Sequence, residues 1–165
     1  MNFTDYIQTW AKGDLQQGKI MLAFGVLGLV IQFFIFKSDH SMLKGMMIPL
    51  SLLVLIFIGY GSFLTSTRMN HATTNIENYQ NNPQEVLQTA LKKANTDNKN
   101  YTALKPIWGI LIVVSISLFF VFTKDDYKGL SLGLLVLFLS ALITDSLLHH
   151  RLKPYLEFLN QLMKN

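Results

Sequence analysis

The stretch GMMIPLSLLVLIFIGYGSFLTST, at residues 45–67, contains no charged side chain and is bounded by Lys44 and Arg68. A helix that spans a bilayer needs about 20 mostly apolar residues, and this stretch is long enough to supply them. A helix of that length in a water-soluble domain would carry charged residues on one face every turn or two. The stretch therefore predicts a transmembrane helix over residues 46–65.

Charge-free apolar stretches at residues 20–36, 106–123 and 129–144 predict three further spans, over residues 20–36, 106–122 and 129–148. Only 15% of the 165 residues are charged, whereas an average soluble domain has about 25%. The length suits one domain. The predicted fold class is therefore an all-α integral membrane protein, with a four-transmembrane-helix bundle in a single membrane domain that comprises residues 1–165.

Two similar phrases divide this bundle into two helical hairpins. FFIFKSDHSMLKG at residues 33–45 and FFVFTKDDYKG at residues 119–129 both end a span, turn at an aspartate and resume at Lys-Gly. The predicted hairpins occupy residues 20–65 and 106–148. Either the hairpin is duplicated, as a parallel repeat about an axis along the membrane normal, or the two loops converged on the same chemistry.

Lysine and arginine residues predict the orientation of the chain. Ten of them lie before the first span, between the two hairpins and after the last span, whereas four lie in the two short hairpin loops. Because cytoplasmic segments are enriched in these residues, both termini are expected in the cytoplasm. The lead has no signal-peptide cleavage pattern, so the first span is expected to be retained. We expect a multi-pass protein of the bacterial inner (plasma) membrane.

Three segments outside the spans have apolar residues at helical spacing. They are an amphipathic lead at residues 1–19, a cytoplasmic connector at 66–105 with a helix near 83–94, and an amphipathic tail at 149–165. Their apolar stripes either lie on the membrane or on each other, or form a docking surface for a partner protein.

Local signals predict where these short helices begin and end. Gly13 is expected to end the lead helix, and Asp14 to cap the first span. Asn82 is expected to cap the connector helix, which the sequence ANTDNKN at residues 94–100 then breaks. Pro154 is expected to open the tail helix.

The candidate polar-site residues are Asp145, His149, Arg68 and Gln32. Asp145 is the only acid within an apolar stretch, and His149 follows it by one helical turn. A functional interpretation is a proton relay, or a metal pair formed with His71. A structural interpretation pairs Asp145 with His149, with Arg68 or with free backbone amides. Gln32 is expected to form a hydrogen bond between helices.

Small residues predict where the helices pack closely. Gly25 and Gly28 lie on the first span, and Gly129 and Gly133 form a small-xxx-small pair on the fourth. That pair is suited either to packing within the bundle or to a homodimer.

The sequence excludes several chemistries. It contains no cysteine, which removes disulfide exchange, thiol catalysis and thiolate metal sites. It also lacks a phosphate-binding glycine loop and the common hydrolase motifs. We therefore predict no catalytic residues, no metal and no cofactor. The net charge of +4 fits the positive-inside pattern and attraction to anionic lipid, so nucleic acid is not an expected partner.

Two functional hypotheses follow. The first is a non-catalytic membrane protein that binds a protein partner through its cytoplasmic helices, as an accessory, scaffold or protective subunit. The alternative is a small oligomeric channel or transporter with a polar pathway near Asp145. In both cases the lipid bilayer is the first partner.

Overall fold

The computed structural model describes residues 2–164, and within them it contains helices and no strand. The helices are α1 (Phe3–Lys37), α2 (Ser41–Gly45), α3 (Met47–Asn81), α4 (Pro83–Val121) and α5 (Asp125–Leu162). All except the short α2 are long and apolar enough to cross a membrane. The prediction of an all-helical multi-pass membrane protein is confirmed in the number, length and composition of its apolar helices.

Each long helix extends well beyond its apolar stretch. The 35 residues of α1 correspond to about 52 Å, against about 30 Å for the hydrocarbon core of a bilayer. We call residues 20–65 and 106–148 the apolar half, and the other described residues the polar half. Large hydrophobic side chains of the apolar half face outward, such as Phe120, which is 78% exposed, as expected for helices surrounded by lipid.

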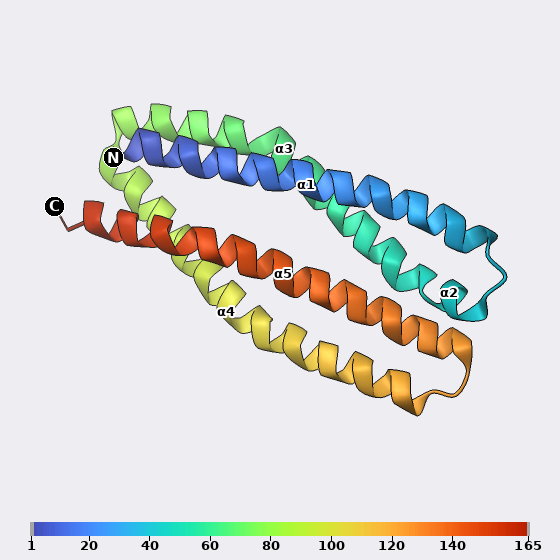
Figure 1. Cartoon of the computed structure of the whole chain (residues 1–165). Coiled ribbons are helices and arrows are strands. Elements are labelled where there is room, and N and C mark those ends of the chain that lie inside the picture. Colours follow the sequence, from blue (N-terminus) through green and yellow to red (C-terminus); the bar gives the residue numbers. More distant parts are fainter. Residues whose placement is uncertain (1, 165) are drawn as a thin grey trace.

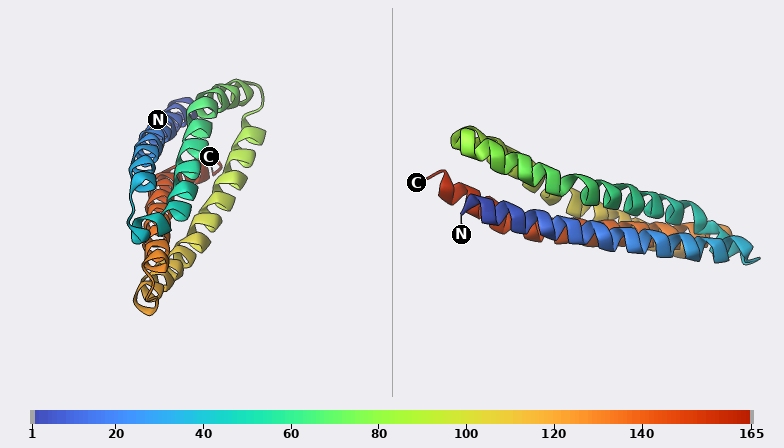
Figure 2. Two further views of the ribbon diagram at one scale, coloured as in Figure 1. Left: turned by 90° about the vertical axis from the view of Figure 1, so that its right-hand side faces the viewer. Right: turned by 90° about the horizontal axis from the view of Figure 1, so that it is seen from above.

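The chain places its connections at two opposite ends (Figure 1). Both termini and the turn at Asn82 lie at the polar end, and the other connections, including the short α2, lie together at the far end. Helix α1 packs mainly along α3, and α4 packs mainly along α5. Helix α3 has far less contact with α4, as the views in Figure 2 illustrate.

The largest buried core lies in the polar half. Phe3 and Ile7 of α1, Leu87 of α4, and Tyr155 and Leu159 of α5 belong to one buried cluster. Stacked aromatic rings join the helices within it: Phe3 lies 4.2 Å from Tyr79, centroid to centroid. The apolar stripes of the lead, connector and tail are thus buried against each other.

The predicted breaks in these segments were wrong, because the helices continue through them. Helix α1 passes through Gly13, α4 passes through residues 94–100, and α5 passes through Pro154. Glycine costs a helix about 1 kcal/mol and proline about 3 kcal/mol. Burial of several side chains on both sides of each site offsets costs of that size. By contrast, the predicted cap at Asn82 is confirmed, since its side chain accepts a hydrogen bond from the backbone of Glu85.

A close helix crossing lies at the far end. A methyl group added to Gly129 would overlap the backbone carbonyl of Met42, and one added to Gly45 would overlap that of Asp126. Gly45 and Gly129 are the glycines of the two Lys-Gly pairs. The contact is reciprocal: Gly129 faces the carbonyl of the residue three positions before Gly45, and Gly45 faces the carbonyl of the residue three positions before Gly129. Only a residue without a side chain allows α2 and α5 to approach this closely.

Candidate functional site

An ion-pair cluster centred on Asp14 joins three helices of the polar half. Asp14 is 2% exposed, and its Oδ2 lies 3.0 Å from Nε of Arg68 on α3. Its Oδ1 lies 3.5 Å from Nη1 of Arg151 on α5. The preceding residue, Gly13, leaves room for this arginine: a Cβ there would lie 3.0 Å from Arg151 Nη1. A buried charge requires such partners, because its unpaired burial is costly.

Opposing effects act on the ionisation of Asp14. Burial raises the pKa of its carboxyl group because it penalises the charged form. The positive charges of Arg68, Arg151 and Lys93 oppose this rise. Asp14 thus holds the guanidinium groups of Arg68 and Arg151 close to α1, at the point where α1, α3 and α5 meet.

Aromatic rings support the same cluster. The guanidinium carbon of Arg68 lies 5.2 Å from the centre of the Trp10 ring, a distance typical of a cation–π contact. Trp10 stacks on Tyr155 with centroids 5.3 Å apart, and Tyr6 stacks on Phe158 at 4.4 Å. These stacked rings extend from the ion pair of Asp14 and Arg68 toward the two ends of the chain.

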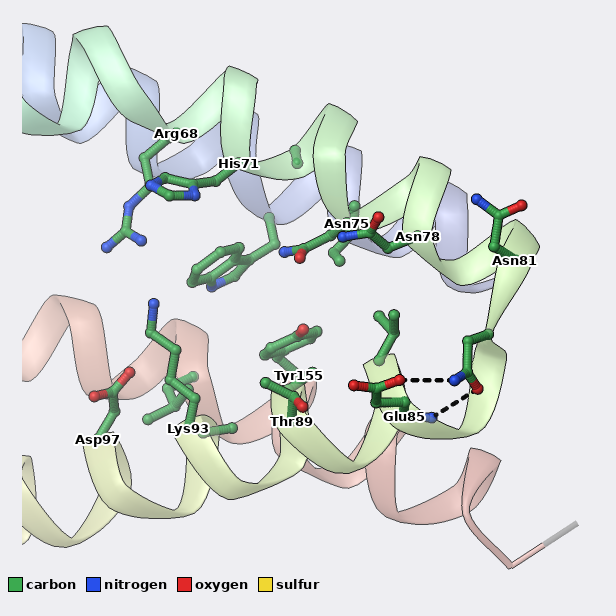
Figure 3. Close-up of a pocket in the computed structure, with 18 residues that line it drawn as sticks. Arg68, His71, Asn75, Asn78, Asn81, Glu85, Thr89, Lys93, Asp97 and Tyr155 are labelled. Atoms are coloured by element: carbon green, nitrogen blue, oxygen red, sulfur yellow. Dashed lines mark hydrogen bonds between the residues drawn. The ribbon is translucent and has the colours of Figure 1, made fainter.

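A groove of about 600 Å³ lies beside this cluster, between α3 and α4. Figure 3 shows its two helical walls and the side chains that point into it. The floor comes from α1 and α5 through apolar and aromatic side chains: Ile7, Trp10, Leu152 and Tyr155. The volume is in the range of ordinary ligand pockets, about 300–1,000 Å³.

The two walls of the groove differ in chemistry. Helix α3 contributes Arg68, His71 and a row of amides at Asn75, Asn78 and Asn81. Helix α4 contributes Glu85, Thr89, Lys93 and Asp97, with Ala90 and Ala94 between them. At the closed end, Nδ2 of Asn82 donates to Glu85 Oε2 at 2.7 Å. Amide groups both donate and accept hydrogen bonds, so this rim can pair with other polar groups.

Asp145 has a partner other than those expected. Its Oδ2 accepts a hydrogen bond from Trp108 Nε1 at 2.7 Å. Within the described residues, the expected pairing of Asp145 with His149 or Arg68 was wrong. Arg68 is paired with Asp14, and His149 is hydrogen-bonded to Lys105 and Asn98. Trp108 stands on α4, so the bond joins α4 to α5.

His149 is 6% exposed and lies between two side chains of α4. Lys105 Nζ donates to its Nδ1 at 2.8 Å, so the proton of the neutral ring lies on Nε2, which donates to Asn98 Oδ1 at 2.8 Å. Burial lowers the pKa of His149, and the charges of Lys105 and Lys153 lower it further. These contacts join α4 to α5 at the level of Asn98 and Lys105.

The other candidates lie apart from these. His71 lines the groove, and no group of three or more His, Asp or Glu residues within residues 2–164 could hold a metal ion. The Nε2 of Gln32 is buried and has no hydrogen-bond partner in the described part of the chain. Gln32 lies one turn and a half before the end of α1, far along the helix from the groove. The four candidate polar residues therefore do not form one site.

The four candidate packing glycines face neighbouring helices. A Cβ on Gly25 would lie 2.7 Å from Ile58, and one on Gly28 would lie 2.5 Å from Val54, both on α3. A Cβ on Gly133 would lie 3.0 Å from Pro49, one turn beyond the contact of Gly129. All four glycines thus contact other helices of the same chain.

Sequence reasoning missed the role of Asp14 and the groove. The available signal was the spacing of Ala11, Asp14 and Gly18, which puts the acid on the same face as two small residues. A comparison of the chain with protein-family models, curated proteins and solved structures found no match. The functional argument therefore depends on the geometry of the site.

Proposed function

We propose that this chain is a non-catalytic, multi-pass membrane protein that binds an amphipathic helix of a partner protein in the groove between α3 and α4. The groove is the observation that supports this proposal. It combines an apolar floor with a polar rim, the pattern of sites that accept one face of a helix. The buried stripes of the polar half pack on each other, and where they meet, Ile7, Leu152 and Tyr155 form the floor of the groove.

The shape of the groove favours a helical segment. Its α3 wall extends from Arg68 to Asn82, about 21 Å at 1.5 Å per residue. Ala72, Ala90 and Ala94 are small and would allow a third helix to approach closely. The amides of the α3 rim are uncharged, which favours a segment whose apolar stripe is flanked by uncharged polar side chains.

The polar side chains elsewhere support a non-catalytic role. The carboxylate of Asp14 is paired with two arginines, that of Asp145 with Trp108, and the ring of His149 with Lys105 and Asn98. A general acid or base needs a free position for the proton it transfers. The alternative, a channel or transporter near Asp145, would require a flux that Asp145→Asn alters in reconstituted vesicles.

We further propose that the polar half faces the cytoplasm of a bacterial cell, with the chain in its inner membrane. The lysine and arginine count supports this orientation, because all ten residues of the richer set belong to the polar half. The same proposal extends to the architecture. The reciprocal contacts of Gly45 and Gly129 support two hairpins that arose by duplication of one.

Photo-crosslinking tests the partner proposal. A benzophenone amino acid replaces Asn78, which lines the groove, or Gln80, which is exposed on α3 but does not line it. We expect one defined protein adduct from position 78 in native membranes and none from position 80. Thr89→Trp, which fills the groove, should abolish the adduct and prevent co-purification of the same protein.

Two outcomes would contradict the proposal. Equal adducts from positions 78 and 80 would show that the groove has no preference for a partner. A protein that co-purifies equally with the Thr89→Trp variant would bind somewhere other than the groove.

A further inference from the structure

Two positive side chains face each other across one end of the groove. Arg68 extends from α3 and Lys93 from α4, and Figure 3 shows their charged ends directed toward one another. Within residues 2–164, Lys93 has no carboxylate within the 4.0 Å of an ion pair, and Arg68 has only Asp14. Like charges that converge in this way repel each other unless an anion lies between them.

The surrounding charges leave this end of the groove positive. Arg68, Arg151 and Lys93 all act on the buried carboxylate of Asp14, and Asp97 is the other acid that lines this end. Arg151 does not line the groove but is paired with Asp14, so the carboxylates of Asp14 and Asp97 are matched by three basic groups. The indole ring of Trp10 forms the floor beneath Arg68, so the guanidinium is held in place before any ligand arrives.

The position along α3 corresponds to the depth of lipid headgroups. Arg68 follows the end of the span at residue 65 by three residues, about 4.5 Å along the helix. The headgroup layer adds about 5–8 Å to each side of the hydrocarbon core. On the membrane side of Arg68, α3 exposes Phe63 and Ile56, and α3 and α4 make little contact with each other. Lipid chains can therefore lie along this face.

We propose that the Arg68–Lys93 end of the groove binds the phosphate of an anionic phospholipid. The phosphate lies between the guanidinium and ammonium groups, which both donate hydrogen bonds to its oxygens. The acyl chains extend along the exposed apolar side chains of α3, which begin at Phe63, five residues before Arg68. Basic pockets between transmembrane helices bind anionic headgroups in this manner. This proposal does not depend on a protein partner in the groove.

The experiment uses the full chain, purified in a neutral detergent. Its unfolding temperature is measured alone, with phosphatidylglycerol, with phosphatidylcholine, and with inorganic phosphate at the same concentration. We expect phosphatidylglycerol to raise the unfolding temperature by a few degrees, and the other two additions to leave it unchanged, because only a bound ligand stabilises the folded state.

Lys93→Gln and Lys92→Gln form a matched pair. Both remove one exposed charge from the same turn of α4, but only Lys93 lines the groove. We expect Lys92→Gln to keep the shift with phosphatidylglycerol, Lys93→Gln to lose at least half of it, and Lys93→Arg to restore it. Without lipid, Lys92→Gln should unfold at the wild-type temperature, and the lipid shift of every variant is measured from its own lipid-free value.

Three results would overturn the proposal. Equal shifts for Lys93→Gln and Lys92→Gln would place the lipid elsewhere. An equal shift with phosphatidylcholine would show that the anionic headgroup is not recognised. The same shift with inorganic phosphate would identify a soluble anion, and not a lipid, as the ligand.

Discussion

Asp14 joins three helices of the polar half through its ion pairs. It is a buried acid on α1 whose partners, Arg68 and Arg151, come from α3 and α5. Because these partners lie on other helices far along the chain, the local sequence could only suggest a helix cap at this position. The carboxylate is instead a link between three helices.

Replacement of Asp14 by asparagine should destabilise the protein. Loss of one member of a buried ion pair leaves the other charges uncompensated and costs about 3–5 kcal/mol. The measurement is the free energy of unfolding in detergent. Asp5→Asn is the control, since Asp5 is an exposed acid in the first turn of the same helix and should change the free energy by at most about 1 kcal/mol. Equal effects of the two substitutions would contradict the role of Asp14.

His149 makes the contact between α4 and α5 sensitive to acid. Burial, Lys105 and Lys153 lower its pKa from the ordinary value of about 6.5. The unfolded chain then binds a proton at a higher pH than the folded chain does. Its contribution to stability is therefore complete above about pH 6.5 and is lost as the pH falls below that value.

His149→Gln tests this pH dependence. Glutamine does not titrate in this range, so the variant should lose less stability than the wild type between about pH 7.5 and about pH 5.5. His150→Gln is the matched control, because His150 is exposed next to it; it should follow the wild type. The unfolding temperature at each pH is the measurement, and an identical pH dependence in all three proteins would exclude the expected role.

At the scale of the elements, the close approach of α2 and α5 depends on Gly129. A side chain there would meet the backbone of Met42, whereas a Cβ on Gly109 would meet nothing within 4 Å. Gly129→Ala should thus destabilise the fold by about 1–3 kcal/mol, as overpacking does. Gly109→Ala should be neutral or stabilising by up to about 1 kcal/mol, because alanine favours the helix.

Thermal unfolding of these two variants in one detergent provides the comparison. A Gly129→Ala variant as stable as Gly109→Ala would show that the two helices can separate without cost.

The helices themselves were partly predictable from sequence. The charge-free stretches identified all four apolar helices, because the length and composition that a bilayer demands are local properties. The cap at Asn82 was predictable in the same way, but the continuity of α1, α4 and α5 through the polar half was not. Gly13 is a local signal for the end of a helix and Pro154 for the start of one, but the buried contacts of Ile7, Tyr155 and Leu159 outweigh both signals. Such contacts depend on residues distant in sequence.

For the molecule as a whole, the orientation in the membrane can be measured directly. The chain has no cysteine, so single cysteines can report on one position each. Asp39→Cys lies at the far end and Gln80→Cys at the polar end, and both positions are exposed. On spheroplasts, a membrane-impermeant maleimide should label the first and should label the second only after permeabilisation. The reverse pattern would contradict the proposed orientation.

The groove requires the helices of the polar half to pack together as one bundle and not to lie separately on the membrane surface. A cross-link between two of these helices tests that packing most directly. Tyr6 of α1 stacks on Phe158 of α5 at 4.4 Å, while Asn160 is exposed on the opposite face of α5. The measurement is cross-linking in native membranes with a short thiol-specific reagent. The Tyr6→Cys and Phe158→Cys pair should cross-link almost completely, and the Tyr6→Cys and Asn160→Cys pair should not. Absence of the first cross-link, or equal yields from both pairs, would contradict the bundle and the groove together.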